Sequence, residues 1–210
     1  ISSGFIDTKR LFWVDRLEHL VNYSKKDILK ITFPCDMSFD ISSDVNKIET
    51  VKVIKSIIKS DKRKIYDLVL DEIESQTGSS DYCTIRNYQN LSARLVRKLD
   101  KPPLYEVGGH TVNHEILSQL KTHDLEYEVA ECLRQLKNIT KRNVDLFSYP
   151  EGQSKHFNNK VIDVIKNAGI KICPTAIAGV NNFKSSPYKL KRIMVGFMDY
   201  KFPFEVKNDK

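Results

Sequence analysis

The sequence lacks long hydrophobic runs, has few glycines and prolines, and shows no low-complexity segment. No stretch approaches the roughly 18 apolar residues of a transmembrane helix, so a membrane-spanning protein is not expected. Residues 1–12 lack the layout of a signal peptide, which leaves the cytoplasm and the cell envelope open as locations. The 210 residues, 40% of them hydrophobic, are enough to bury a full core. We therefore expect one globular domain over residues 1–210.

Closely spaced cysteines are also missing: the four cysteines stand far apart, at positions 35, 83, 132 and 173. A zinc knuckle needs close pairs, and a disulfide framework is typical of small secreted domains. We interpret all four as small buried or half-buried residues, which favours a reducing compartment.

The net charge of +7 is not concentrated in one block, because the lysines and arginines are interleaved with acidic residues. Short basic clusters of this kind usually lie on solvated helix faces and loops, and no motif of a nucleic-acid-binding module accompanies them. Nucleic acid is therefore not an expected partner. A basic interaction domain without a metal, binding anionic polymers in a salt-sensitive way, stays open as a minor hypothesis.

The spacing of apolar residues predicts a chain in which helices and short strands alternate. Helices are predicted over residues 12–21, 45–58, 61–75, 90–98, 125–139 and 160–168. Strands are predicted over residues 28–33, 104–107, 145–149 and 170–173, with residues 39–44 continuing a small hairpin. The second half has the spacing of βα units and favours a parallel sheet or barrel, whereas a region of about residues 40–98 is predicted to be a helical insertion.

Two histidines, His110 and His114, follow the predicted strand 104–107 and two glycines. If a helix begins there, imidazoles four residues apart lie on one helical face and can bind a single cation. The sequence therefore predicts a metal site, although a pair of polar residues capping a helix would show the same spacing. His19 and His123 are predicted to face solvent, and so is His156, for which a place at the pocket rim is the alternative. The turn 150–152 follows the next strand, so both strand ends could face one pocket.

Three segments in this order resemble motifs of the polysaccharide deacetylase family, the NodB-type carbohydrate esterases. Residues 106–114 look like the family's metal-binding H-[ST]-x-x-H motif with its glycine-rich lead-in. Residues 147–152 are similar to its F-[AS]-Y-P-x-G groove motif, and residues 167–173 to its step from helix to strand. Because the order and spacing also agree, the resemblance extends over most of the chain.

This resemblance implies a distorted (β/α) barrel that removes N- or O-acetyl groups from carbohydrates with a divalent metal, zinc being the first choice. His110 and His114 would be two of three protein ligands to the metal. The acetyl pocket would be shaped by Tyr149, Pro150, Glu151 and Gly152. Within it, the Glu151 backbone N–H is a candidate oxyanion donor. Tyr149 either offers its ring to a sugar or packs in the core, which is the commoner role of a strand aromatic.

The sequence departs from the family pattern in two places. The T-F-D-D-G type of motif, which would supply the general base and the third ligand, is absent, and we expect an N-terminally truncated barrel without its first βα unit. The late L-x-x-H segment, which would supply the general acid, is not recognisable either, so we name no catalytic residue. Arg192 stands nearest its place, but a permanently protonated guanidinium is a poor proton donor. It either binds a carboxylate or phosphate of the substrate or is an ordinary surface cation.

The function predicted in this way is a metal-dependent hydrolase acting on carbon–nitrogen bonds other than peptide bonds, with an acetylated carbohydrate as its partner. We expect little turnover from this chain, since the base and one ligand are missing. The alternative is a deacetylase-like protein that binds carbohydrate without hydrolysing it. The sugar, the position of its acetyl group, the native metal and the oligomeric state are not determined by the sequence.

Overall fold

The structure is a computed structural model that describes residues 1–61, 65–78 and 89–193. The chain forms two compact units, one of residues 5–95 and the other of residues 1–4 together with residues 96 onward. The sequence predicted one domain with a helical insertion of about residues 40–98. The helical unit in fact starts much earlier, at Phe5, because its first helix shares a hydrophobic core with the later ones.

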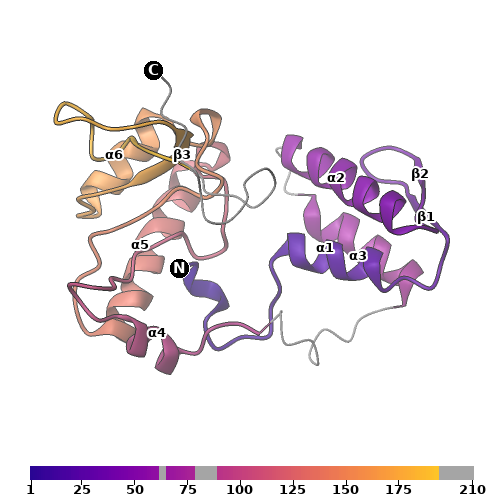
Figure 1. The fold of residues 1–210 in the computed structure, drawn as a ribbon, viewed down its shortest axis with the longest axis horizontal. Helices are drawn as coiled ribbons and strands as arrows, with labels where there is room; N and C mark the ends of the chain where they lie inside the picture. Colours follow the sequence, from indigo (N-terminus) through magenta and orange to yellow (C-terminus); the bar gives the residue numbers. More distant parts are fainter. Residues whose placement is uncertain (62–64, 79–88, 194–210) are drawn as a thin grey trace, which may run out of the picture. The chain divides into compact units, whose positions relative to one another are not determined.

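The unit of residues 5–95 consists of helices and one β-hairpin (Figure 1). Its elements are α1 (Trp13–Asn22), β1 (Ile28–Ile31), β2 (Met37–Asp40), α2 (Asp44–Ser60) and α3 (Tyr66–Thr77). Strands β1 and β2 pair antiparallel, with Ile28 opposite Asp40. Leu29 and Ile31, alternate residues of β1, are buried among apolar side chains of the three helices. These elements confirm the predicted helices and hairpin, while residues 62–64 of the predicted helix 61–75 lie outside the described residues.

The second unit has the alternating order of helix and strand that the sequence predicted. Helix α4 (Ala93–Leu99) lies at the chain boundary between the units and is followed by α5 (Thr122–Thr140), α6 (Asn159–Asn167), β3 (Pro174–Ala178) and β4 (Leu190–Arg192). Short 3-10 helices occur at η1 (Ser3–Phe5), η3 (Leu117–Gln119) and η4 (Ser154–His156). Helices α5 and α6 contact each other and bury one apolar face each, which includes Leu125 and Ile165.

Successive extended segments of this unit pair in parallel. Gly109 pairs with Phe147, Leu146 with Ile172, and β3 with β4. Because α5 and α6 connect the first three segments, the arrangement is a series of βα units. The α/β class is thus confirmed. The described residues contain only short sheets and no closed barrel, and none of their helices is long and apolar enough to cross a membrane.

The predicted buried strand over residues 104–107 is wrong. Leu104 is 83% exposed and Tyr105 66% exposed. A turn at Pro102 and Pro103 brings Tyr105 back against Lys101 in an antiparallel bridge. Parallel pairing begins only at Gly109, whose N–H donates to the Leu146 carbonyl at 2.8 Å. The mostly apolar residues 104–107 therefore belong to a turn that precedes the paired segment, and they are not part of that segment.

Candidate metal and substrate site

The segment from His110 to His114 is a loop, so the expected helical face for the two histidines is wrong. The backbone is left-handed at Thr111, with φ of 63°, and at His114, with φ of 61°. Non-glycine residues seldom adopt this conformation, and two in five residues turn the chain sharply back. The imidazole rings of His110 and His114 nevertheless meet, with centroids 4.7 Å apart and planes at 71°. The loop, rather than a helical repeat, brings the two rings together.

His110 is held in one tautomer by the neighbouring strand segment. Its Nδ1 lies 2.7 Å from the Ser148 carbonyl oxygen, with the Ser148 hydroxyl at 3.0 Å. Because a carbonyl only accepts, Nδ1 carries the proton and Nε2 keeps the lone pair. Burial lowers the pKa of His110 to about 4, so the ring is neutral at physiological pH. A neutral imidazole with Nδ1–H on a carbonyl is the usual state of a metal-bound histidine.

The buried carboxylate of Glu128 in α5 holds the histidine loop through hydrogen bonds. Glu128 is 4% exposed, and its Oε2 accepts from the backbone N–H groups of Val112 and Asn113, each at 2.9 Å. Its Oε1 accepts from the Asn113 side-chain amide at 2.6 Å. Three donors compensate for removing the charge from water. The predicted site does not include Glu128, although a lone Glu on the apolar face of α5, beside Val129, is a signal that could identify it.

Residues 1–4 run along the other side of the same loop. The Ser2 hydroxyl donates to the His110 carbonyl at 2.7 Å, and the N–H groups of Ser3 and Gly4 donate to the carbonyls of Thr111 and Val112 at 3.1 and 3.0 Å. A Cβ at Gly4 would lie only 2.8 Å from the Val112 carbonyl oxygen, so a side chain would push the two segments apart. The loop is therefore fixed by main-chain contacts as well as by Glu128.

The second predicted motif forms a tight turn after the segment that contains Ser148. Glu151 and Gly152 are both left-handed, with φ of 60° and 65°. The Gly152 carbonyl accepts from Ala176 N–H at 2.8 Å, and a Cβ on Gly152 would lie 2.8 Å from that nitrogen. Pro150 is buried and Glu151 is half-buried. Glycine is therefore required at position 152 for both conformation and space.

Tyr149 lies in the core. It is 2% exposed, its ring stacks on Phe157 with centroids 4.4 Å apart, and its hydroxyl donates to the Tyr188 carbonyl at 2.9 Å. Burial also raises the pKa of this phenol far above its ordinary value. A ring enclosed in this way has no free face for a sugar, which favours the packing role over the stacking role.

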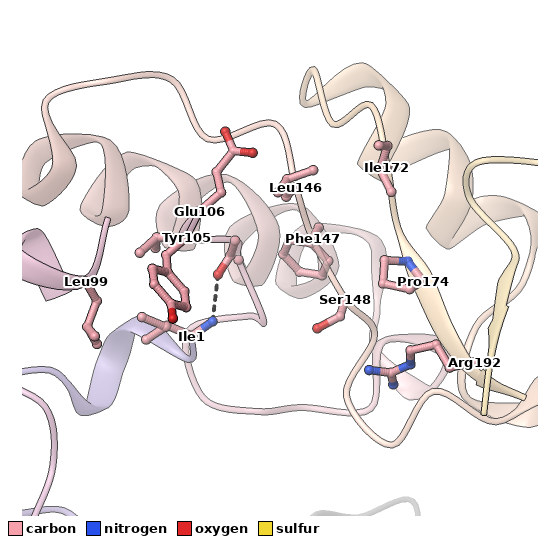
Figure 2. A pocket seen from close by; sticks show the side chains of 13 residues that line it. Ile1, Leu99, Tyr105, Glu106, Leu146, Phe147, Ser148, Ile172, Pro174 and Arg192 are labelled. Carbon is pink, nitrogen blue, oxygen red and sulfur yellow. Dashed lines mark hydrogen bonds between the residues drawn. The ribbon is translucent and has the colours of Figure 1, made fainter. Parts of the chain in front are cut away.

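A pocket of about 540 Å³ opens among the parallel segments (Figure 2). It is lined by residues 105–109 and 146–148, together with Ile1, Leu99, Ile172, Pro174 and Arg192. Most of the lining side chains are apolar, and Ser148 and Arg192 are polar groups at one side of it in Figure 2. Ser148 therefore connects the pocket to the His110 ring.

Two of the remaining histidines contradict the prediction that they face solvent. His19 is 3% exposed and stacks on Tyr23, with ring centroids 4.6 Å apart. His156 is 7% exposed, and its Nδ1 accepts from the Gln153 N–H at 3.1 Å within the turn of η4. Both rings are used for local packing and capping that residue spacing does not reveal. His123 is exposed, as predicted.

Within residues 1–61, 65–78 and 89–193, no group of three histidine, cysteine or acidic side chains could hold a metal ion. The two imidazoles fit a metal in donor type and proximity, and the His110 ring fits it in protonation state as well. A catalytic zinc usually has three protein ligands, one more than these two rings could supply.

Comparison with known proteins identifies one family. A family model described as polysaccharide deacetylase matches residues 54–173, more than half of the chain. The deacetylase PplD of Streptococcus pyogenes, solved in complex with acetate, is 17% identical with a TM-score of 0.46, over 64% of this chain and 61% of that one. The polysaccharide deacetylase BC0361 of Bacillus cereus is 18% identical with a TM-score of 0.44, over 61% of this chain and 43% of that one. This chain thus spans less than two thirds of either structure, and no curated protein matches it. By the family match, the chain belongs to the polysaccharide deacetylase family.

Proposed function

We propose that this chain forms the metal-binding part of a carbohydrate deacetylase that hydrolyses N- or O-acetyl groups with a divalent ion, zinc first. Family membership supports the reaction class. The observation that carries the metal site is the His110 tautomer, because the Ser148 carbonyl holds the proton on Nδ1 and leaves the Nε2 lone pair for a ligand beside the His114 ring.

In this proposal the residues of the chain have separate tasks. His110 and His114 hold the ion, which when bound supplies Lewis acidity that polarises an acetyl carbonyl and lowers the pKa of water. The Glu151 backbone N–H is the proposed donor to the oxyanion, a task for which the identity of the side chain is irrelevant. Pro150 and Gly152 shape the wall beside it, and Tyr149 supports that wall from the core.

The third ligand and the general base are proposed to be carboxylates outside the described residues. Two neutral imidazoles leave the full charge of a divalent ion uncompensated, and a hydrolytic zinc site usually has three protein ligands. With the two imidazoles as its only protein ligands, the ion should support acetate release slowly or not at all. Robust acetate release by this chain would contradict that expectation.

Elemental analysis of zinc tests the metal site without reference to activity. The wild-type chain, dialysed against a small excess of zinc, is expected to retain metal that the double variant His110→Ala, His114→Ala does not retain. His123→Ala is the matched control, since its side chain is 93% exposed and should leave the zinc content unchanged. Near-zero zinc in wild type and double variant alike would remove the metal-site proposal.

A carbohydrate-binding protein without turnover is the second candidate. It is favoured by the absence, among the described residues, of any carboxylate that joins the two histidines. Acetate release from acetylated amino sugars, measured with saturating zinc on the longest natural form of the protein, separates the candidates. Sugar binding without acetate release would favour the carbohydrate-binding protein over the deacetylase.

A further inference from the structure

The chain between residues 164 and 193 contains cations and no acidic residue. The cations are Lys166, Lys171, Lys184, Lys189, Lys191 and Arg192. Two of them have local partners: Lys171 pairs with Asp145 at 2.7 Å, and Lys166 lies over the Tyr188 ring, 5.2 Å from its centroid. The other four belong to the loop before β4 and to β4 itself. A concentration of one sign of charge beside a pocket attracts ligands of the opposite sign.

Arg192 differs from the surface lysines because it is anchored at the pocket. It ends β4, and its Nε donates to the Thr175 carbonyl in β3. The Thr175 hydroxyl in turn donates to the Leu190 carbonyl at 2.9 Å, which ties the two strands together under the guanidinium. In the part of the chain that the structure describes, Arg192 has this carbonyl as its hydrogen-bond partner and forms no ion pair with a carboxylate. The two terminal nitrogens of the fork are thus available to a ligand.

The guanidinium also lies close to the histidine loop. Arg192 and Ser148 line the same pocket, and Figure 2 shows them at the same side of it. Ser148 in turn holds His110 through its carbonyl at 2.7 Å. A sugar whose acetyl group approaches the histidines would therefore place a neighbouring substituent near Arg192.

We propose, on the basis of the deacetylase function above, that the sugar bound by this chain carries an oxyanion, a carboxylate or a phosphate, next to its acetylated position, and that Arg192 binds it. The planar fork of a guanidinium matches both anions through two parallel hydrogen bonds. An uncharged acetylated sugar would leave this fork without a partner. Lys189 and Lys191, exposed on the same strand and its approach, strengthen the local positive potential.

Three probes with the same acetylated hexosamine ring test the inference: N-acetylglucosamine, N-acetylglucosamine 1-phosphate and N-acetylmuramic acid, which carries a carboxylate. Their dissociation constants are measured by NMR titration of the zinc-loaded chain at low salt. At least one anionic probe is expected to bind about tenfold more tightly than the neutral one, the size of a charge-assisted hydrogen-bonded pair. The comparison of phosphate with carboxylate identifies the anion.

Variants then assign the effect to one residue. Arg192→Gln should abolish the preference for the anion, and Arg192→Lys, which keeps the charge but loses the fork, should retain only part of it. Lys184→Gln is the matched control, an exposed cation of the same acid-free segment that does not line the pocket. Circular dichroism of each variant checks that it is folded.

Equal affinity of the wild-type chain for all three probes would overturn the inference. An equal loss of preference in Lys184→Gln and Arg192→Gln would also overturn it, because the effect would then belong to diffuse surface charge. Acetate release from neutral and anionic sugars at equal rates would remove the inference and keep the deacetylase. Anion preference without acetate release from any substrate, measured with saturating zinc on the longest natural form of the protein, would keep Arg192 as the binding residue and contradict the proposed reaction alone.

Discussion

At the scale of single residues, the loop that presents His110 and His114 depends on the carboxylate of Glu128. Glu128→Ala would leave three donors of Val112 and Asn113 without their acceptor, at a cost of about 3 kcal/mol in the free energy of unfolding. We expect zinc affinity to fall by roughly 10- to 100-fold as well, as for other residues that orient metal ligands. Isothermal titration with zinc and urea unfolding measure the two effects.

Glu126→Ala provides the control for this substitution, because Glu126 lies on the exposed side of the same helix. Glu128→Gln keeps the shape and one acceptor oxygen, and it should recover part of the zinc affinity. Unchanged zinc affinity in Glu128→Ala, with the chain folded, would show that the carboxylate stabilises the loop without positioning the histidines.

A second prediction at this scale concerns Gly152. Gly152→Ala combines a left-handed backbone with a Cβ 2.8 Å from the Ala176 nitrogen, and should destabilise the chain by about 3 kcal/mol. Gly169→Ala, where φ is 86° and no atom lies within 4 Å, should cost only the backbone strain, about 1 kcal/mol. Thermal unfolding compares the two. Equal losses would mean that the contact with Ala176 relaxes freely.

At the scale of elements, Arg142 joins three segments around the start of the histidine loop. Its Nε and Nη2 donate to Asp100, just after α4, both at 2.6 Å, and its Nη1 donates to Glu106 at 2.7 Å. Asp100 also accepts from the Val107 N–H at 2.9 Å. The hydrogen bonds from Arg142 lower the pKa of Asp100 below its ordinary value. The segment leading to Gly109 is thus fixed by an ion pair rather than by the apolar strand that the sequence predicted.

This ion pair gives the stability a definite pH dependence. Because the folded-state pKa of Asp100 lies below the unfolded value of about 4, its contribution is complete above pH 4 and is lost as the pH falls through the folded-state value. Arg142→Met should therefore lower the free energy of unfolding by about 2 kcal/mol at pH 7 and by much less near pH 2. Urea unfolding at both pH values measures this, and an equal loss at both would contradict the role of the carboxylate.

Elements differ in how well the sequence predicts them, for a physical reason. Helices α1, α2, α5 and α6 were predicted within a few residues, because burial of one face requires a local repeat of apolar side chains. The parallel segments are one or two paired residues long, and their pairing partners lie far away in the chain. Residues 104–107 are mostly apolar, but their one bridge joins Tyr105 to the nearby Lys101 and not to a strand of the sheet, so their composition misled the prediction. The spacing of apolar residues within one segment does not show which distant segment it pairs with.

The site was predictable to the same limited extent. The spacing of His110 and His114 indicated that the rings could meet, but the left-handed backbone that brings them together depends on contacts with Glu128 and with residues 1–4. The contact of Ser148 with His110 requires the pairing of Gly109 with Phe147. Residue type and spacing therefore identify candidate ligands, whereas their orientation comes from tertiary contacts.

At the scale of the whole molecule, each compact unit has its own core, and we expect each to lose structure on its own. Leu20 is fully buried in the unit of residues 5–95 and Leu125 in the other. Leu20→Ala should cost about 3 kcal/mol and lower amide protection in α1, α2 and α3 while leaving α5 and α6 unchanged, and Leu125→Ala should do the reverse. Native-state hydrogen exchange measures both. Loss of protection throughout the chain in either variant would indicate one cooperative unit.

The acceptor for His110 belongs to the main chain of residue 148, and this affects how the site tolerates sequence change. Every amino acid has a backbone carbonyl, so a substitution at position 148 leaves that acceptor in place. The tautomer of His110 is therefore determined by the backbone conformation at residue 148 and does not depend on which side chain that residue carries. A substitution of Ser148 should therefore leave the same His110 nitrogen presented, provided that the segment beside Gly109 stays paired.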